Sequence, residues 1–417
     1  MAILRSRFVL LSAFLGVCVW AAPGFASWQV IEVPMQPTWS GEIDVSDVND
    51  VGEACGMGNY VINTSSTAFR FDVATQTVTE LPHLYPPDPI TLVTAINNNG
   101  IVCGYSHNVN GDSQAVYYVG TTLNTIPYPP DANTDSDFRA YNINDNGVIV
   151  GYFWSTGGER TAFYYQGGVS YSLDAQIRAA GLTGLQLAEG VNGLDVICGV
   201  ADDTLGITTA WTYDINSGAA AVTVIGKIGT DDCSAVAIND SGQTIGRAKQ
   251  DALDKYHAVT YDGSWHVVDP TIDEFQWGQD INNKGRMVGH SNTGSSRWVW
   301  YSDGYGDGSM VAISLDGWSQ QSFNAINNRD WIAATGLTAT SGSDDRGCII
   351  RPGPGDINHD GHVNLEDFAT FAICYMGSDV TTPPPGCSEG EFDDCDMDGD
   401  GDADLSDFST FALNYGS

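Results

Sequence analysis

The chain has 417 residues and carries 52 acidic residues against 16 Lys and Arg, which gives a formal net charge of −36 at pH 7. This balance excludes a protein that tracks nucleic-acid phosphates, because such proteins need clustered basic residues, and it argues against adsorption to anionic membranes. Charged residues make up only 16% and hydrophobic residues 42%, so the chain is not a disordered polyelectrolyte. Its many Gly, Asn, Asp, Thr and Tyr residues favour strands and turns over helices.

Residues 1–26 have the three parts of a secretory signal peptide. Arg5 and Arg7 form a positive start, the stretch 8–22 is apolar, and Gly24 and Ala26 are small residues at the −3 and −1 positions of a cleavage site. This apolar stretch is too short for a transmembrane helix, and no stretch of about 20 apolar residues occurs elsewhere, so the sequence predicts no transmembrane helix. We therefore expect residues 1–26 to be removed and the mature protein to be secreted or held at the cell surface.

The mature chain keeps an even number of cysteines, which permits disulfides in an exported protein. They are Cys55, Cys103, Cys198, Cys233, Cys348, Cys374, Cys387 and Cys395. Cys374 and Cys387 flank a Pro-rich spacer, and we expect a bridge between them, with Cys395 or Cys348 as competing partners. Cys55, Cys103 and Cys198 share a motif position that Val or Ile fills elsewhere, so they are expected to be small buried hydrophobes.

One pattern recurs seven times. It consists of an apolar residue, Asn, usually Asp or Asn, any residue, Gly, two further residues, an apolar residue and Gly. Asp195 and Asp330 replace the first Gly, and Ala334 replaces the second. The Asn residues are separated by 43 to 48 positions, and they are Asn49, Asn97, Asn144, Asn192, Asn239, Asn282 and Asn327. A period of this length over seven copies indicates a propeller or an array.

Each repeat contains three to four short strand-like runs separated by turn residues, which is the content of one propeller blade. The segment 28–33 looks like the third strand of a repeat, whereas the seventh repeat stops after its second strand at 348–350. The N-terminal strand could therefore complete the last blade and leave no free edge. We predict a mainly β chain with a closed seven-bladed β-propeller of repeats of about 47 residues at 27–352. An open β-solenoid of the same units is the alternative.

The repeats resemble the HAF-type extracellular repeat. The marks of that family are an Ile-Asn-x-x-Gly-x-Val-x-Gly run, a later Ala-Phe-x-Tyr-like strand and a Leu-containing turn. Residues 67–71 followed by 81–84 form the closest copy, and the match covers most of 41–350. The family implies an exported repeat protein and assigns no activity.

Two twelve-residue calcium loops lie in the C-terminal tail, at 356–367 and at 396–407. Oxygen-bearing side chains occupy loop positions 1, 3, 5, 9 and 12, position 6 is Gly, and the backbone carbonyl at position 7 supplies a further ligand. The expected ligands of two Ca²⁺ ions are Asp356, Asn358, Asp360, His362, Asn364 and Asp367 in the first loop, and Asp396, Asp398, Asp400, Asp402, Asp404 and Asp407 in the second. His362 and Asp402 are expected to act through their carbonyls.

Helices are expected after both loops. Their predicted apolar faces, which should pack together, are Leu365/Phe368/Phe371/Ala372 and Leu405/Phe408/Phe411/Ala412. Position 12 is Asp where the general EF-hand pattern has Glu, and the sequence predicts no amphipathic helix before either loop.

With these two departures the tail closely resembles a type I dockerin. The resemblance covers 356–417, after a linker at 353–355, and its motif is specific because both loops and both helix starts match. It implies an α-helical domain that binds two Ca²⁺ ions and docks onto a cohesin domain. Loop positions 10 and 11, which commonly contribute to cohesin choice, are Leu365-Glu366 and Leu405-Ser406. A purely structural calcium module is the alternative.

No catalytic residue stands out in the sequence. The motif Asn residues are sevenfold and are expected to make turn or backbone hydrogen bonds. We therefore expect a secreted binding or assembly protein whose propeller binds carbohydrate or protein and whose tail docks to a cohesin-type partner. The alternative is a propeller glycoside hydrolase or polysaccharide lyase in polysaccharide catabolism. A non-repeated cluster of Asp/Glu, Tyr, Arg or His at the propeller channel would favour the enzyme.

Overall fold

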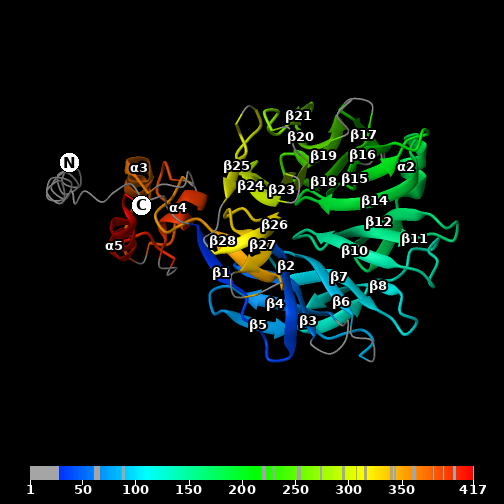
Figure 1. Ribbon diagram of the computed structural model, residues 1–417, viewed down its shortest axis with the longest axis horizontal. Coiled ribbons are helices and arrows are strands. Elements are labelled where there is room, and N and C mark those ends of the chain that lie inside the picture. Colours follow the sequence, from blue (N-terminus) through cyan, green and yellow to red (C-terminus); the bar gives the residue numbers. More distant parts are fainter. Residues whose placement is uncertain are drawn as a thin grey trace. The chain divides into compact units, whose positions relative to one another are not determined.

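The computed structural model forms two compact units, one at Val30–Arg351 and one that contains Pro352–Ser417 (Figure 1). The predicted signal peptide lies outside the described residues. The residues that the structure describes are 28–60, 66–86, 90–217, 222–228, 231–250, 255–272, 275–293, 296–306, 308–313, 317–338, 341, 344–358, 363–378, 380–387, 389–397 and 401–416.

The first unit consists of seven four-stranded antiparallel sheets, which confirms the mainly β, seven-bladed propeller. In blades 1 to 6 the strands lie in chain order, and the first strand of each blade is the innermost. Blades 1 to 3 are β2 (Trp39–Val48), β3 (Glu53–Tyr60), β4 (Ser66–Asp72), β5 (Thr77–Glu80); β6 (Thr91–Ile96), β7 (Ile101–His107), β8 (Ser113–Val119), β9 (Thr122–Thr125); and β10 (Phe138–Ile143), β11 (Ile149–Trp154), β12 (Arg160–Gln166), β13 (Val169–Ser172).

Blades 4 to 6 follow the same order, and the short helix α2 (Asp174–Ala179) lies between blades 3 and 4 in the sequence. Their strands are β14 (Thr183–Val191), β15 (Val196–Asp202), β16 (Thr208–Asp214), β17 (Val222–Gly226); β18 (Cys233–Ile238), β19 (Thr244–Gln250), β20 (Lys255–Tyr261), β21 (Trp265–Val267); and β22 (Phe275–Ile281), β23 (Met287–Thr293), β24 (Ser296–Ser302), β25 (Val311–Ile313).

The N-terminal strand closes the seventh blade, as predicted. This sheet has the order β1 (Gln29–Glu32), β28 (Arg346–Arg351), β27 (Ile332–Thr338), β26 (Trp318–Ile326). The amide of Val33 donates to Gly347 O at 2.9 Å, and the same bond joins Leu81 to Ala68 in blade 1 at 2.8 Å. Counted from the Asn motif, β1 is the third strand of its repeat. In the blade it is the fourth, because each blade begins one strand before the motif.

Both Gly positions of the repeat have a geometric reason. The first Gly ends the turn with a left-handed backbone, and Asp195 (φ 63°) and Asp330 (φ 59°) adopt the same conformation where they replace it. The second Gly lies against a bulge in the inner strand. A Cβ atom at Gly56, for example, would lie 2.0 Å from Asp44 O.

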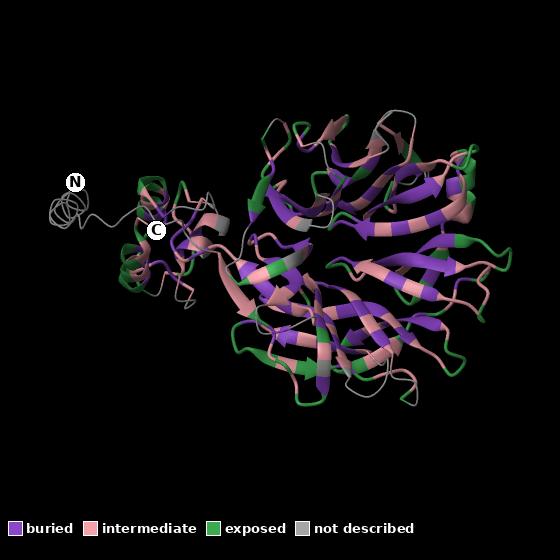
Figure 2. Cartoon of the chain, viewed as in Figure 1, coloured by how far each residue is buried: buried purple, intermediate pink, exposed green. Residues whose placement is uncertain are grey.

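The propeller core lies between neighbouring blades, where buried residues form stripes along the strands (Figure 2). Cys55, Cys103 and Cys198 are fully buried and free, as predicted for small hydrophobes, and so are Cys233 and Cys348. Burial raises the pKa of Cys103 to about 12, so this thiol stays protonated at neutral pH.

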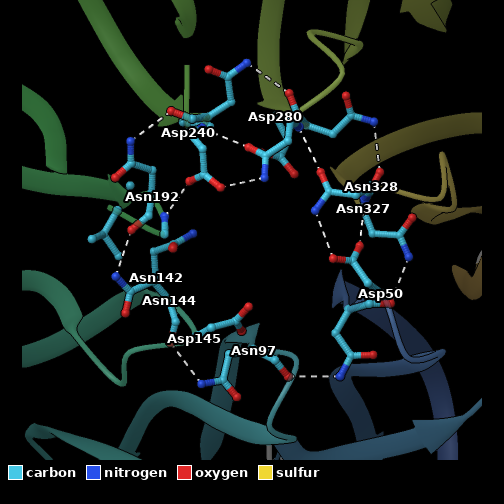
Figure 3. A pocket seen from close by; sticks show the side chains of 18 of the residues that line it. Asp50, Asn97, Asn142, Asn144, Asp145, Asn192, Asp240, Asp280, Asn327 and Asn328 are labelled. Carbon is cyan, nitrogen blue, oxygen red and sulfur yellow. Dashed lines mark hydrogen bonds between the residues drawn. The ribbon is translucent and has the colours of Figure 1, made fainter. Parts of the chain in front are cut away.

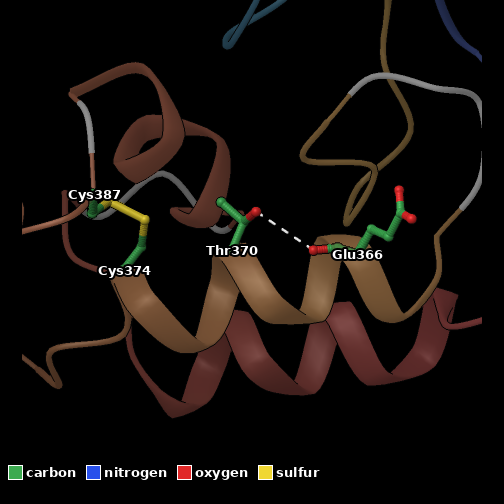
Figure 4. The surroundings of a disulfide bond; sticks show 4 residues. All are labelled: Glu366, Thr370, Cys374 and Cys387. Atoms are coloured by element: carbon green, nitrogen blue, oxygen red, sulfur yellow. Dashed lines mark hydrogen bonds between the residues drawn. A yellow bond between two sulfur atoms is a disulfide. The ribbon is translucent and has the colours of Figure 1, made fainter.

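The C-terminal unit has helices α3 (Leu365–Cys374), α4 (Glu389–Cys395) and α5 (Leu405–Asn414). The predicted disulfide between Cys374 and Cys387 is present and ties the end of α3 to the Pro-rich spacer (Figure 4). The competing partners Cys395 and Cys348 are free. Helix α4 directly precedes the second loop and buries Phe392 and Cys395 in the core of the unit, so the expectation of no amphipathic helix is wrong for that loop.

The predicted helix faces are correct only in their aromatic members. Phe368 and Phe371 pack against Phe408 and Phe411, with ring centroids 5.6 to 6.3 Å apart. In contrast, Leu365 is 67% exposed and Leu405 is 60% exposed, and Ala372 and Ala412 are exposed as well. The Asp at position 12 determines which helix face is buried. Its side chain points into the loop, so the residues four positions later, Phe371 and Phe411, lie on the same buried face.

Candidate functional site

The structure describes eight of the twelve predicted calcium ligands. Asp360, His362, Asp398 and Asp400 lie outside the described residues. The eight described ligands are Asp356, Asn358, Asn364, Asp367, Asp396, Asp402, Asp404 and Asp407. Asp356, Asp367, Asp402 and Asp407 are buried, which is unusual for carboxylates unless they are paired or bind a metal.

The position-12 aspartates organise their loops. Asp367 Oδ1 accepts from the amides of Ile357 (2.9 Å) and Asn358 (3.0 Å), and Oδ2 accepts from Asn364 (2.8 Å). Asp407 repeats this arrangement with the amides of Met397 (2.6 Å) and Asp404 (2.7 Å). Each of these carboxylates therefore joins the start of its loop to the start of the exit helix.

The exit helices are capped by the position-9 residues. Asn364 accepts from the amide of Glu366, and Asp404 accepts from that of Ser406. Asp404 also accepts a hydrogen bond from the hydroxyl of Ser378, which is the main cause that lowers the pKa of its carboxyl. Asp404 is therefore ionised at neutral pH, as a calcium ligand must be.

Three carboxylates of the second loop converge. One oxygen each of Asp402, Asp404 and Asp407 lie within 4.8 Å of one another. Oxygen ligands that bind one Ca²⁺ ion at 2.3–2.6 Å lie at most about 5 Å apart, so this donor set fits calcium. Asp402, which was expected to act through its carbonyl, therefore also brings a side-chain oxygen to the cluster.

The two halves of the C-terminal unit hold each other through equivalent bonds. The amide of Met376, after α3, donates to Ala403 O of the second loop at 3.0 Å. The amide of Gly416, after α5, donates to Val363 O of the first loop at 2.7 Å. Met376 and Gly416 are 40 residues apart, as are Val363 and Ala403, so the two hydrogen bonds are equivalent. The segment that follows each helix is therefore bonded to the loop of the other half.

The same repeat leaves apolar side chains in solvent. Leu365 and Ile373 on α3 are 67% and 51% exposed, and their equivalents Leu405 and Leu413 on α5 are 60% and 87% exposed. The two helices therefore expose apolar side chains at equivalent positions.

In the propeller, the motif asparagines form a closed ring of hydrogen bonds that joins every blade to the next (Figure 3). Asn49 Nδ2, for example, donates to Asn97 O at 2.9 Å, and Asn327 Nδ2 closes the ring at Asn49 O at 2.8 Å. The Oδ1 atom of each Asn accepts from the amide four residues later in its own turn. The predicted role of these Asn residues in their turns is thus confirmed. The hydrogen bond from each Asn to the next blade was not predicted from the sequence.

The ring borders a polar cavity of about 190 Å³ at the ends of the inner strands. A second ring, formed by the residues after each Asn, is interrupted where Gly193 lacks a side chain. Asp280 also lines the cavity and accepts from the amide of Ile326 in the next blade at 2.8 Å. Burial raises its pKa to about 7. These polar groups join blades to one another, which is a structural role.

Replacing one ring Asn should destabilise the propeller. Asn97→Ala removes the bond to Asn144 O (2.9 Å) and two bonds that Asn97 Oδ1 accepts in its turn. We expect a loss of about 2–4 kcal/mol in the free energy of unfolding, because several buried groups lose partners. Urea unfolding followed by Trp fluorescence checks this. Asn124→Ala, which removes one exposed bond to Thr122 O, is the control and should cost less than about 0.5 kcal/mol.

No family model and no curated protein matches the chain. Among solved structures it is similar to the β-propeller domain of the trilobed protease from Pyrococcus furiosus, with 10% identity and a TM-score of 0.49 over 75% of this chain and 94% of that one. It is similar to the polysaccharide lyase Uly1, with 11% identity and a TM-score of 0.45 over 82% and 95%. It also resembles a Mycobacterium tuberculosis puromycin-hydrolyzing peptidase, with 12% identity and a TM-score of 0.49 over 76% and 52%. Similarity at this level says nothing about activity.

Within the described part of the chain, no helix is long and apolar enough to cross a membrane.

Proposed function

We propose that the protein is an exported, calcium-dependent docking protein. Its C-terminal unit would bind two Ca²⁺ ions and dock onto a cohesin-type domain, and its propeller would carry the binding or assembly function. The observation that carries this proposal is the converging carboxylates of Asp402, Asp404 and Asp407 in a loop that the sequence repeats 40 residues earlier. Calcium supplies the positive charge that holds such carboxylates together.

The exposed apolar residues support docking over a purely structural calcium module. Leu365 and Leu405 occupy loop position 10, where dockerins contact their partners, and they point away from the core of the unit. A module that only folded around calcium would have no need to expose matched apolar groups on both helices. Ile373 and Leu413 extend the same pattern by two helical turns.

The propeller is proposed to bind carbohydrate or protein. Its cavity rim is built from sevenfold-equivalent residues that bond to each other, which favours a structural role for that end. A second candidate, polysaccharide cleavage by the propeller, is favoured by one observation only. Non-repeated Tyr, Arg and Glu residues gather at the opposite end of the inner strands.

Docking can be tested with a panel of purified type I cohesin domains and the intact chain in calcium. The double variant Leu365→Asp/Leu405→Asp should lose at least about tenfold in affinity for whichever cohesin the unmodified protein binds, because charges replace apolar contacts. Val169→Asp, on the exposed outer strand of blade 3, is the matched control and should bind normally. Calcium binding without affinity for any cohesin would leave the structural module as the better account.

A further inference from the structure

A group of six side chains breaks the sevenfold symmetry of the propeller. We call it the tyrosine–arginine cluster, and its members are Tyr105, Arg139, Tyr141, Tyr152, Glu189 and Arg247. They come from β7, β10, β11, β14 and β19, on blades 2 to 5 (Figure 1). Arg139 precedes the ring residue Asn144 by five positions, which places it about 16 Å along the inner strand from the Asn ring.

Contacts across blades hold the cluster together. The guanidinium of Arg139 lies 4.6 Å from the ring centroid of Tyr105 on the neighbouring blade. Arg139 pairs with Tyr152 across β10 and β11, and the rings of Tyr152 and Tyr141 are 5.5 Å apart. Glu189 lies close enough to Tyr141 to add to the effect of burial in raising the pKa of that tyrosine, and Arg247 lies close enough to Glu189 to offset part of the effect of burial on its pKa.

Tyr105 and Tyr152 occupy equivalent positions in blades 2 and 3, but no other blade has an Arg at the position of Arg139. The position of Arg139 is filled in the remaining inner strands by Asp44, Leu92, Leu187, Ser234, Trp277 and Ser322. This position differs from blade to blade, so it has no repeated structural role and can serve a local function in blade 3.

The cluster also has unused hydrogen-bonding capacity. Within the described part of the chain, the hydroxyls of Tyr105, Tyr141 and Tyr152 and the carboxylate of Glu189 make no hydrogen bond. Arg139 uses one nitrogen to bind Asp137 at 2.8 Å, but its buried Nε has no partner. Arg247 forms no ion pair among the described residues although the chain has 52 acids; its guanidinium lies 5.1 Å from the ring of Tyr256. Of these polar atoms, Arg139 Nε is buried without a partner, which is uncommon in proteins. Arg247 is exposed and Tyr105, Tyr141 and Glu189 are half-buried, so their polar groups can be reached by an external ligand.

The side-chain chemistry narrows the class of ligand. Guanidinium groups favour a carboxylate, and tyrosine rings favour a flat apolar face. Burial raises the pKa of Glu189 to about 7, so its carboxyl group can both accept hydrogen bonds from sugar hydroxyls and donate one. Burial also raises the pKa values of all three tyrosines and keeps their hydroxyls as neutral donors. A sugar acid offers a carboxylate, hydroxyl donors and an apolar ring face together, whereas an acidic peptide offers chiefly the carboxylates.

We infer that the tyrosine–arginine cluster is a binding site for uronic-acid-containing oligosaccharides. Arg139 on blade 3 and Arg247 on blade 5 each offer a guanidinium to a sugar carboxylate, the tyrosines contact the sugar rings, and Glu189 forms hydrogen bonds with the sugar hydroxyls. This inference rests on the proposed binding role of the propeller and specifies its ligand.

The test is calorimetric titration of the intact chain with tetragalacturonate, with cellotetraose as the neutral probe and tetraglutamate as the acidic peptide. We expect tetragalacturonate to bind at least about tenfold more tightly than either of the other two. Arg247→Gln should weaken its binding at least about tenfold, since hydrogen bonds to charged groups are strong. Tyr141→Phe, which removes only a hydroxyl, should weaken it less.

The matched control is Arg178→Gln, because Arg178 lies on α2 and pairs with Glu159 and Asp174 outside the cluster. It should bind tetragalacturonate normally, and Trp fluorescence should show that all variants are folded. Absence of tetragalacturonate binding would overturn the inference, and so would equal losses in Arg178→Gln and Arg247→Gln. Tighter binding of cellotetraose or tetraglutamate would also overturn it, while leaving the proposed binding role of the propeller intact.

Discussion

Removal of calcium should unfold the C-terminal unit and leave the propeller folded. Residues 355–417 hold 15 acidic residues and no Lys or Arg, so their mutual repulsion opposes a compact state. One oxygen each of Asp402, Asp404 and Asp407 lie within 4.8 Å of one another, where repulsion between carboxylates is strong. Two bound Ca²⁺ ions offset this repulsion, and the binding free energy thereby becomes folding free energy. The disulfide at Cys374 would restrain the unfolded segment without restoring α3 and α5.

Two signals in the intact chain separate the units. No Trp follows Trp331, and nine of the 11 Trp residues lie in the propeller unit Val30–Arg351, so Trp fluorescence reports mainly on the propeller. The helical signal in far-ultraviolet circular dichroism comes mainly from α3, α4 and α5, since α2 has only six residues. With EDTA we expect loss of most of the helical signal and an unchanged fluorescence spectrum, with full recovery in excess calcium. Full helicity in EDTA would contradict this account of the tail.

Deletion of 28–33 should open the propeller. The deletion removes β1, the bond from Val33 to Gly347 O and the fully buried Val33 side chain, which packs in one core cluster with Ile349. It leaves β28 with an unpaired edge. Several backbone bonds and one buried Val together contribute several kcal/mol, so we expect the melting temperature to fall by about 10 °C or more.

Scanning calorimetry is the appropriate measurement, because the deletion also removes Trp28. A synthetic peptide of residues 28–34, added in excess, should restore much of the melting temperature by occupying the vacant edge. A peptide of the same composition in scrambled order is its control. Unchanged melting of the truncated protein would show that β1 does not close the ring.

The repeat predicted the propeller because its residues serve the same geometry in every blade. Asn97 and its equivalents form hydrogen bonds both within their own turn and to the next blade. Because both bonds require Asn at the same place in every blade, the spacing of these Asn residues along the chain is regular. The sequence could not reveal that the acceptor lies in the neighbouring blade, since turn and interblade bonds require the same residue. Asp195 and Asp330 appeared as exceptions, yet they accept bonds from Asn144 and Asn282 of the preceding blades.

The errors in the tail also have physical causes. Hydrophobicity alone predicts that Leu365 and Leu405 face inward, whereas the buried Asp367 and Asp407 determine which helix face is buried. The sequence does not predict helix α4, Glu-Gly-Glu-Phe-Asp-Asp-Cys, because two apolar residues, Phe392 and Cys395, are too few to show a helical pattern. The Cys374–Cys387 pair was predictable, since its spacing across a stiff spacer limits the alternatives.

The tyrosine–arginine cluster could not be recognised in the sequence. Its residues are 142 positions apart at the extremes, Tyr105 and Arg247, and none belongs to a motif. Only the packing of one blade against the next brings Arg139 to Tyr105. In a repeat protein, the residues that differ between equivalent positions are therefore the signal for function, once the blades have been aligned.

The number of Ca²⁺ ions bound by the intact protein can be measured by calcium titration calorimetry. We expect two Ca²⁺ ions per chain for the unmodified protein. We expect one ion for Asp367→Ala and one for Asp407→Ala, because each substitution removes a ligand and the backbone bonds that shape its loop. A stoichiometry of one or none for the unmodified protein would contradict the account, and so would two ions retained by both variants.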